Sequence, residues 1–203
     1  MTSSYPCQKR TSGAGNWQAY IRDSRDSEIY RIVLMPDNKW WLAQNLKYAG
    51  TGSSVTTSGC TKDKCGRWYT SAQASGSSGY GQNRQGVCPN GWVLPVAQSY
   101  TTLYNSISGT ASVVAARLRS LNSPCAGGND YYGWASSIRL HRTGNVTGGT
   151  FDTQYINDNA TSPCGAGVDF CGINCSACNN IHVSASEGLC SGFATVARCF
   201  RQL

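Results

Sequence analysis

Charged residues are scarce in this sequence and make up 13% of its 203 residues. Lys and Arg number 17 against 10 Asp and Glu, which gives a formal net charge of +7, but the positive residues are scattered along the chain. A nucleic-acid-binding surface needs clustered positive charge. We therefore expect an ordinary solvated surface and no nucleic-acid partner.

Long apolar runs are also missing. No stretch approaches the roughly 20 apolar residues of a membrane-spanning helix. The N-terminal sequence MTSSYPCQKR lacks the apolar run of a secretion signal. The sequence thus predicts no membrane insertion of this segment, and if the protein is exported we expect its signal or anchor to have been removed.

The sequence is poor in the patterns of common enzyme sites. With only two histidines, His141 and His182, a multi-histidine metal site is excluded. A Ser-His-Asp or Cys-His arrangement stays compatible with the composition, but no nucleophile-elbow sequence surrounds any Ser or Cys. The Gly-rich stretches fit neither a phosphate loop nor a dinucleotide fingerprint. We expect that the protein is not an enzyme and uses no cofactor or metal.

Cysteine and glycine, by contrast, are abundant, at 11 and 23 residues. Thiols stay reduced in the cytosol, so this many cysteines indicates export to a compartment where disulfides form. Because the number is odd, at least one thiol is free, paired between chains, or paired with a segment outside this sequence. The many glycines and few charges predict a globular protein with much irregular backbone.

The length favours one domain, which we place at residues 17–203 behind a polar lead-in at 1–16. Glu28–Leu34 is rich in β-branched and aromatic side chains and predicts a strand. Residues 36–38 predict a turn, and Lys39–Ala43 predicts the second strand of a hairpin.

Apolar side chains at helical spacing predict two short helices. In Ala97–Ser108 they recur at i, i+3, i+4 and i+7, and Ser112–Leu121 repeats this pattern. Gly109 separates the two helices, and Pro95 is a helix-entry signal.

The stretch Asn122–Leu189 is dominated by Gly, Asn, Ser, Thr and Cys. So long a weakly patterned stretch in a compact domain predicts functional loops. The chain then closes with Phe193–Phe200, whose alternation is typical of a core strand.

Four segments match, in the same order, the motifs of a known family. DSRDSEIY at Asp23–Tyr30, followed by WWLAQNL at Trp40–Leu46, resembles the opening D-x-R-D-G-x-x-Y … W-M-A-E-N-L. GRWY at Gly66–Tyr69 is similar to G-x-L-Y, and CPNGWVLP at Cys88–Pro95 is similar to C-P-x-G-W-x-L-P. Residues 192–199 are similar to the closing G-F-x-V-R-C-V. These are the motifs of the Fibrobacter succinogenes major paralogous domain, which the sequence resembles over nearly its whole length.

That resemblance implies an α+β, C-type-lectin-like fold with short antiparallel strands and hairpins, two short helices and long disulfide-linked loops. The family occurs on bacterial surface proteins, lipoproteins and pilin-like proteins, and ligand binding is its expected role. The matched residues are expected to be scaffold, because Trp41 and Trp92 can each bury about 200 Å² and Gly91 can fix a turn. Cys88 with Cys199 is the disulfide we expect, because it would tie the middle of the fold to its last strand.

The sequence departs from the family pattern at residues 171–190, where a Cys-rich segment stands. From Cys171 it has the C-x₃-C-x₂-C spacing of iron–sulfur clusters in radical enzymes, but in those enzymes the motif lies early in a large barrel. A zinc site that includes Cys164 or Cys190 is another interpretation. We expect structural disulfides instead, with the loop at 50–66 closed locally. Their connectivity is open, and the expected members besides Cys88 and Cys199 are Cys60, Cys65, Cys164, Cys171, Cys175, Cys178 and Cys190.

The sugar-binding motifs of true C-type lectins, E-P-N or Q-P-D with W-N-D, do not occur. Asp152–Asn159 offers oxygen ligands for calcium without EF-hand spacing, so a calcium site there stays an alternative. Every residue of Gly172–Ser186 has a codon that ends in a pyrimidine and arises from an Asn codon by changes of adenine. This resembles the outcome of a diversity-generating retroelement, and an ordinary Cys-linked loop of small residues is the alternative.

Taken together, these patterns predict an extracellular or cell-surface ligand-binding or adhesion domain whose partner is a cell-surface protein or glycan. A structural subunit of a surface filament or pilus, with self-assembly, is one alternative, and a metal- or cluster-binding enzyme is another. Aromatic and amide side chains give contact area and adaptable hydrogen bonds, although the aromatic ones are equally compatible with a core position. The expected contact residues are Tyr131, Tyr132, Trp134, Tyr155, Asn179, Asn180 and His182.

Overall fold

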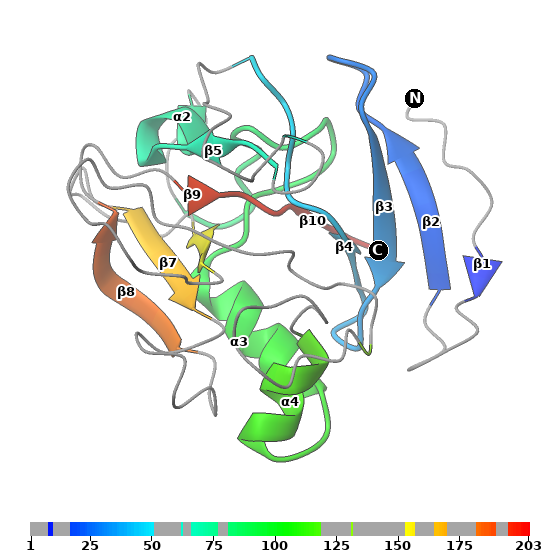
Figure 1. Cartoon of the computed structure of the whole chain (residues 1–203), viewed down its shortest axis with the longest axis vertical. Coiled ribbons are helices and arrows are strands. Elements are labelled where there is room, and N and C mark those ends of the chain that lie inside the picture. The colour runs from blue at the N-terminus through cyan, green and yellow to red at the C-terminus, as the bar shows by residue number, and fades with distance from the viewer. Residues whose placement is uncertain are drawn as a thin grey trace.

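The computed structural model describes the chain in separate stretches, and for some residues, including all of strands β6 to β8, it describes the backbone alone. The described residues are 8–9, 17–50, 62, 66–76, 81–118, 131, 153–156, 165–169, 182–189 and 195–203. They form two five-stranded sheets and the helices α2, α3 and α4 (Figure 1). The prediction of a mixed structure of helices and short, mainly antiparallel strands is confirmed.

The first sheet has the strand order β1-β2-β3-β4-β10, and all of its pairs are antiparallel. Its strands are Gln8–Lys9, Trp17–Arg22, Ile29–Leu34, Lys39–Leu42 and Phe200–Gln202. Strand β1 takes two residues of the expected lead-in into the sheet by pairing with β2. The last strand of the chain therefore lies beside the β3–β4 hairpin, far from it in sequence.

The second sheet has the order β5-β9-β6-β7-β8, with one parallel pair, β6 with β9. Its strands are Trp68–Tyr69, Thr195–Val196, Thr153–Ile156, Gly165–Asp169 and His182–Leu189. Helices α2, α3 and α4 are Ser71–Ser75, Ala97–Ser106 and Ala111–Leu118. In Figure 1, α3 and α4 lie at one end of the molecule, between the two sheets.

The predicted hairpin of β3 and β4 is confirmed. The amide of Met35 donates to the carbonyl of Lys39 (3.0 Å), and Asn38 takes a left-handed conformation with φ of +58°. Asn tolerates this conformation better than most residues. The carboxylate of Asp37 accepts from the backbone amide of Lys39 (3.3 Å) and from the indole Nε1–H of Trp41 (3.1 Å). Local hydrogen bonds thus fix the turn that the sequence indicates.

One apolar cluster fills the space between the first sheet and the two longer helices. The ring of Trp41 lies 5.4 Å from that of Tyr100 and 5.1 Å from that of Phe200, so β4, α3 and β10 meet at this side chain. The apolar spacing in Ala97–Ser108 predicts one helix face toward the core. Tyr100, Leu103 and Ile107 of this face are buried in the cluster. Burial of one helix face against the sheet explains why these short helices form.

A second apolar cluster lies on the opposite face of the same sheet. Tyr30 and Ile32 alternate along β3 with residues of the first cluster, as successive side chains of a strand must. Trp92 packs into this second cluster next to a disulfide between Cys88 and Cys199. The expected disulfide is therefore confirmed, and both tryptophans expected to anchor the core are buried.

The closing segment was wrongly predicted as one alternating strand. Within Phe193–Phe200 only Thr195–Val196 forms β9, and the next strand, β10, starts at Phe200. Residues 196–200 are all buried rather than alternately buried and exposed. The segment passes from the second sheet to the first. Because neighbouring parts of the protein then surround the backbone on all sides, every side chain from 196 to 200 is buried.

The structure differs from the sequence-based expectations at three further places. Helix α2 was not expected, and its N-terminus carries a capping box between Thr70 and Gln73. The stretch 122–189, expected as loops, contains β6, β7 and β8. Gly, Ala and Ser in β7 and β8 have low strand propensity, so pairing with neighbouring strands and not local preference decides their conformation. Helix α3 also ends at Ser106, two residues before the predicted end at Ser108.

Candidate functional site

The residues of the family-like motifs hold the frame together. The carboxylate of Asp23 is fully buried and accepts hydrogen bonds from the guanidinium of Arg25, with Nε to Oδ1 at 2.9 Å. The same guanidinium lies 3.7 Å above the ring of Tyr48. A buried carboxylate needs such a partner, because a lone charge would be costly to desolvate. The D-x-R element is thus a fixed corner between β2 and β3.

The second motif joins three segments through polar side chains. Gln44 Oε1 accepts from the backbone amide of Arg31 (2.9 Å), and Asn45 Oδ1 accepts from Nη2 of the fully buried Arg198 (2.8 Å). The hydroxyl of Tyr30 accepts from the amide of Lys47 (2.8 Å), and burial raises the pKa of Tyr30 above its ordinary value. These contacts connect residues 44–47 to β3 and to the last segment of the chain.

Glycine is required at one position of the third motif. Gly66 has φ of +76°, and a Cβ atom there would lie 2.6 Å from Cβ of Asn45. Gly91 in the C-P-N-G-W motif has φ of +80° in a turn closed by a hydrogen bond from Trp92 N to Pro89 O (2.9 Å). The expectation that Gly91 fixes a turn is confirmed.

Most of the expected contact residues lie outside the described part of the chain. These are Tyr132, Trp134, Asn179 and Asn180, and for Tyr155 in β6 and His182 in β8 only the backbone is described. Tyr131 packs against the first apolar cluster, and the guanidinium of Arg117 lies 4.7 Å above its ring. Its ring therefore has partners within the protein, and its role in ligand contact stays a prediction.

The other cysteines and the expected loop sites also lie outside the described residues. They are Cys7, Cys60, Cys65, Cys125, Cys164, Cys171, Cys175, Cys178 and Cys190, together with half of residues 152–159 and most of residues 172–186. Among the residues that the structure describes, no group of three or more His, Cys, Asp or Glu side chains could hold a metal ion. The cysteines of the iron–sulfur and zinc alternatives, and half of the calcium segment, lie outside the described part of the chain.

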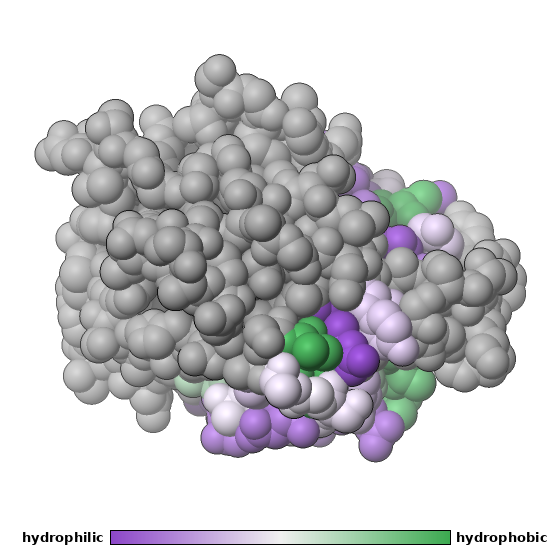
Figure 2. All heavy atoms as spheres, turned by 60° about the horizontal axis from the view of Figure 1, so that its bottom comes forward, coloured by the Kyte–Doolittle hydropathy of each residue, from purple (hydrophilic) through white to green (hydrophobic). Residues whose placement is uncertain are grey.

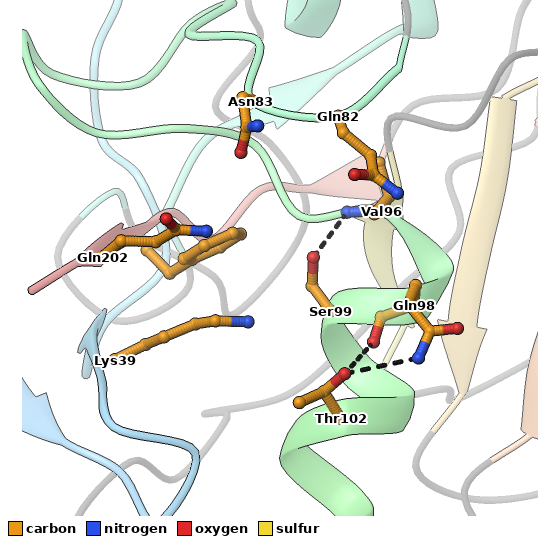
Figure 3. A pocket seen from close by; sticks show the side chains of 9 residues that line it. Lys39, Gln82, Asn83, Val96, Gln98, Ser99, Thr102 and Gln202 are labelled. Carbon is orange, nitrogen blue, oxygen red and sulfur yellow. Dashed lines mark hydrogen bonds between the residues drawn. The ribbon is translucent and has the colours of Figure 1, made fainter.

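A pocket on the described surface joins several segments. It lies between β4, β10, the first turns of α3 and residues 82–83, and has a volume of about 100 Å³ (Figure 3). The lining residues are mostly uncharged and polar, and they comprise Lys39, Gln82, Asn83, Val96, Gln98, Ser99, Thr102, Phe200 and Gln202. Since Gln82, Asn83, Gln98 and Thr102 are exposed, the pocket opens to solvent.

Helix α3 shapes one wall of this pocket. The Ser99 hydroxyl accepts from the backbone amide of Val96 (3.2 Å), and this bond secures the start of the helix. One turn of helix separates Gln98 from Thr102, and Nε2 of Gln98 donates to the Thr102 hydroxyl (3.4 Å). Figure 3 shows Ser99 and Thr102 on the side of α3 nearer to Lys39, while the amide of Gln98 is directed away from Lys39. The wall therefore presents mainly hydroxyl groups to whatever enters.

Lys39 provides the positive charge of the pocket. Its ammonium lies 4.9 Å above the ring of Phe200 and 3.9 Å from the Asp37 carboxylate, and its side chain is 17% exposed. The ring and the carboxylate hold the ammonium in place, since a cation is attracted to the face of an aromatic ring. Asp37 itself is turned into the hairpin, where burial raises the pKa of its carboxyl.

This pocket has no signature in the sequence, because its residues come from separate segments with no characteristic spacing. One usable signal was the polar pair Gln98 and Thr102, which lie four residues apart and so share the exposed face of the predicted helix. Lys39 and Phe200 approach each other only through the pairing of β4 with β10.

Elsewhere the described surface carries no large apolar patch. The exposed large apolar residues are Tyr20, Ile29, Val113 and Leu203. Figure 2 shows apolar residues on the helix end as separate areas among polar ones. Scattered apolar residues are normal on a protein surface, so we take the polar pocket as the candidate site of the described part.

Fold and site together define a disulfide-bonded protein of mixed α and β structure with a small polar surface pocket. Comparison with protein-family models, curated proteins and solved structures finds no match. In the part of the chain that the structure describes, none of the helices has the length and apolar character needed to cross a membrane.

Proposed function

We propose that this protein is an extracellular, non-enzymatic ligand-recognition domain with a C-type-lectin-like frame, related to the Fibrobacter succinogenes major paralogous domain. The proposal is supported by the motifs themselves and by the contacts that their residues make. It receives no support from the comparisons.

The observation that carries the proposal is the buried bridge between Cys88 and Cys199. It joins the C-P-N-G-W motif to the R-C motif at the end of the chain, across a sequence separation of 111 residues. A bridge of this kind is expected in an oxidising compartment and not in the cytosol.

The other motif residues support the same frame. The Q-N pair accepts hydrogen bonds from Arg31 and from the buried Arg198. Arg25 of the D-x-R corner lies over the Tyr48 ring, and Gly66 packs closely against Asn45. Four motifs that are separated in sequence thus meet around one core, as they should if they are the signature of one fold. A rigid frame lowers the entropy that a recognition surface loses on binding.

Binding measurements test the function. The protein, produced in an oxidising host, is applied to immobilised surface polysaccharides and glycoproteins, and binding is followed by biolayer interferometry with mass spectrometry of the ligand before and after. We expect saturable binding without change of the ligand. Absence of saturable binding across the panel, or conversion of a ligand, would contradict the proposal.

The cellular location is tested separately by thiol counting. Native protein from its own cells is alkylated before and after reduction, and the Cys88–Cys199 peptide pair is sought by mass spectrometry. We expect the cross-linked pair in nearly all molecules. Reduced Cys88 and Cys199 in freshly isolated protein would argue for a reducing compartment.

A further inference from the structure

We propose that the pocket between β4, β10 and α3 binds one sugar unit that carries a single carboxylate, such as a hexuronate of a surface polysaccharide. This inference rests on the proposed ligand-recognition function and names the ligand class of a specific site.

The size of the pocket suits a small part of a larger ligand. A single water molecule needs about 10–15 Å³, and the pocket has about 100 Å³. It therefore has room for several non-hydrogen atoms, as in one face of a sugar ring, and is too small to enclose a chain of sugars. The remainder of a polysaccharide would extend through the open side, where Gln82 and Asn83 are exposed.

The uncharged lining matches hydroxyl groups. Side-chain amides carry both donors and an acceptor, and a sugar hydroxyl likewise donates and accepts. Gln82, Asn83, Gln98 and Gln202 bring such amides from three separate segments to one pocket, and Thr102 adds a hydroxyl. Figure 3 shows Gln202 and Thr102 on opposite sides of the same space, with Gln98 at its margin on α3. A ring with several hydroxyls can satisfy groups on both walls, whereas a purely apolar ligand would leave them without hydrogen bonds.

Lys39 sets the charge of the ligand. It is the one cationic residue among the described residues that line the pocket, and an ammonium offers donors only. In Figure 3 its amine points into the space between Gln202 and α3. The distance of 3.9 Å to the Asp37 carboxylate is that of a long ion pair, which leaves donor directions of the ammonium for a ligand. One carboxylate therefore matches the site, while a polyanion would bring charges with no cation to face them.

The test compares three probes: glucuronate, glucose and acetate. Titrations followed by amide and side-chain NMR shifts at physiological salt give a Kd for each probe. We expect glucuronate to bind about tenfold or more tightly than either glucose or acetate, since it adds one charge-assisted hydrogen bond to the hydroxyl contacts. Equal affinities for glucuronate and glucose, or no binding of glucuronate, would overturn the assignment.

Three variants assign the effect to the pocket. Lys39→Gln should remove the preference for glucuronate over glucose while weak binding of both remains. Gln202→Ala should weaken both sugars and keep their ratio. The matched control is Arg201→Gln, which removes one positive charge from the neighbouring exposed position of β10; Arg201 does not line the pocket. Each variant is first checked for an unchanged thermal unfolding midpoint. If Arg201→Gln lost the preference for glucuronate over glucose as fully as Lys39→Gln, the overall charge of the protein would explain the preference, and the proposal would be overturned.

The two proposals can fail independently. Binding of the protein to immobilised surface glycans that is unaffected by Lys39→Gln and Gln202→Ala would leave the recognition function in place and overturn the pocket assignment. Glucuronate binding by the isolated protein, without binding to any surface material, would support the pocket and count against the proposed function.

Discussion

Removal of the disulfide between Cys88 and Cys199 should strongly destabilise the folded protein. The bridge spans 111 residues, and in the chain-entropy model closing a loop of this length stabilises the folded state by about 4.8 kcal/mol at 25 °C. Domains typically unfold at a cost of about 5–15 kcal/mol, so this is a large share. Both cysteines are fully buried, so truncation also removes sulfur atoms from the second apolar cluster.

The assay is equilibrium unfolding in guanidinium chloride, followed by tryptophan fluorescence, for the wild type and for Cys88→Ala with Cys199→Ala. We expect the free energy of unfolding to fall by about 4–5 kcal/mol and the denaturant slope to rise, because the unfolded chain without the bridge exposes more surface. The single variant Cys88→Ala is the control. It loses the same bridge, so its stability should lie within about 1 kcal/mol of the double variant, since the two changes are not additive. A loss below about 1 kcal/mol in the double variant would refute the entropic argument.

Four further predictions concern substitutions of single residues. Asp37→Ala should cost about 1–3 kcal/mol in urea unfolding, because the indole N–H of Trp41 loses its buried acceptor. Burial raises the pKa of the Asp37 carboxyl in the folded state. The contribution of this group to stability is therefore fully present below the unfolded-state pKa and is lost as pH rises through the folded-state pKa. Asp37→Asn should gain stability relative to wild type from about pH 4 upward, and a difference in unfolding free energy that stays constant across pH would contradict this. Gly66→Ala should lower the thermal midpoint clearly more than Gly91→Ala, since both residues have positive φ but only the first Cβ meets neighbouring atoms; equal losses would show that backbone strain alone decides. Tyr30→Phe should cost about 1–3 kcal/mol by chemical unfolding, because a buried backbone amide loses its acceptor, and a neutral result would mean that water replaces the hydroxyl.

The local structure of the first half of the chain could be predicted from the sequence because short-range forces decide it. The apolar spacing in α3 places Tyr100 and Leu103 on one face, and the turn after β3 is fixed by Asp37 and Asn38 themselves. Helix α2 also had a local signal, the capping box from Thr70, which sequence analysis overlooked.

The second sheet could not be predicted in this way. Residues 165–169 are Gly-Ala-Gly-Val-Asp, and of these only Val168 favours a strand. Their conformation depends on pairing with β6 and β8, whose partners are set by the path of the whole chain. The same holds for residues 196–200, where alternation suggested one strand but the passage between two sheets buries every residue.

The sequence by itself determined the β3–β4 hairpin and the amphipathic face of α3, because each depends on neighbours a few residues apart. The pair Cys88 and Cys199 was only an expectation from the sequence, and the fold brings these two distant cysteines together. Only the tertiary structure decided where the last strand lies, which residues surround Arg198 and which side chains form the pocket. Lys39, Gln98 and Gln202 carry no shared signal along the chain. They meet because β10 pairs with β4 and α3 packs beside them, and such contacts arise from the burial of apolar surface by the whole fold.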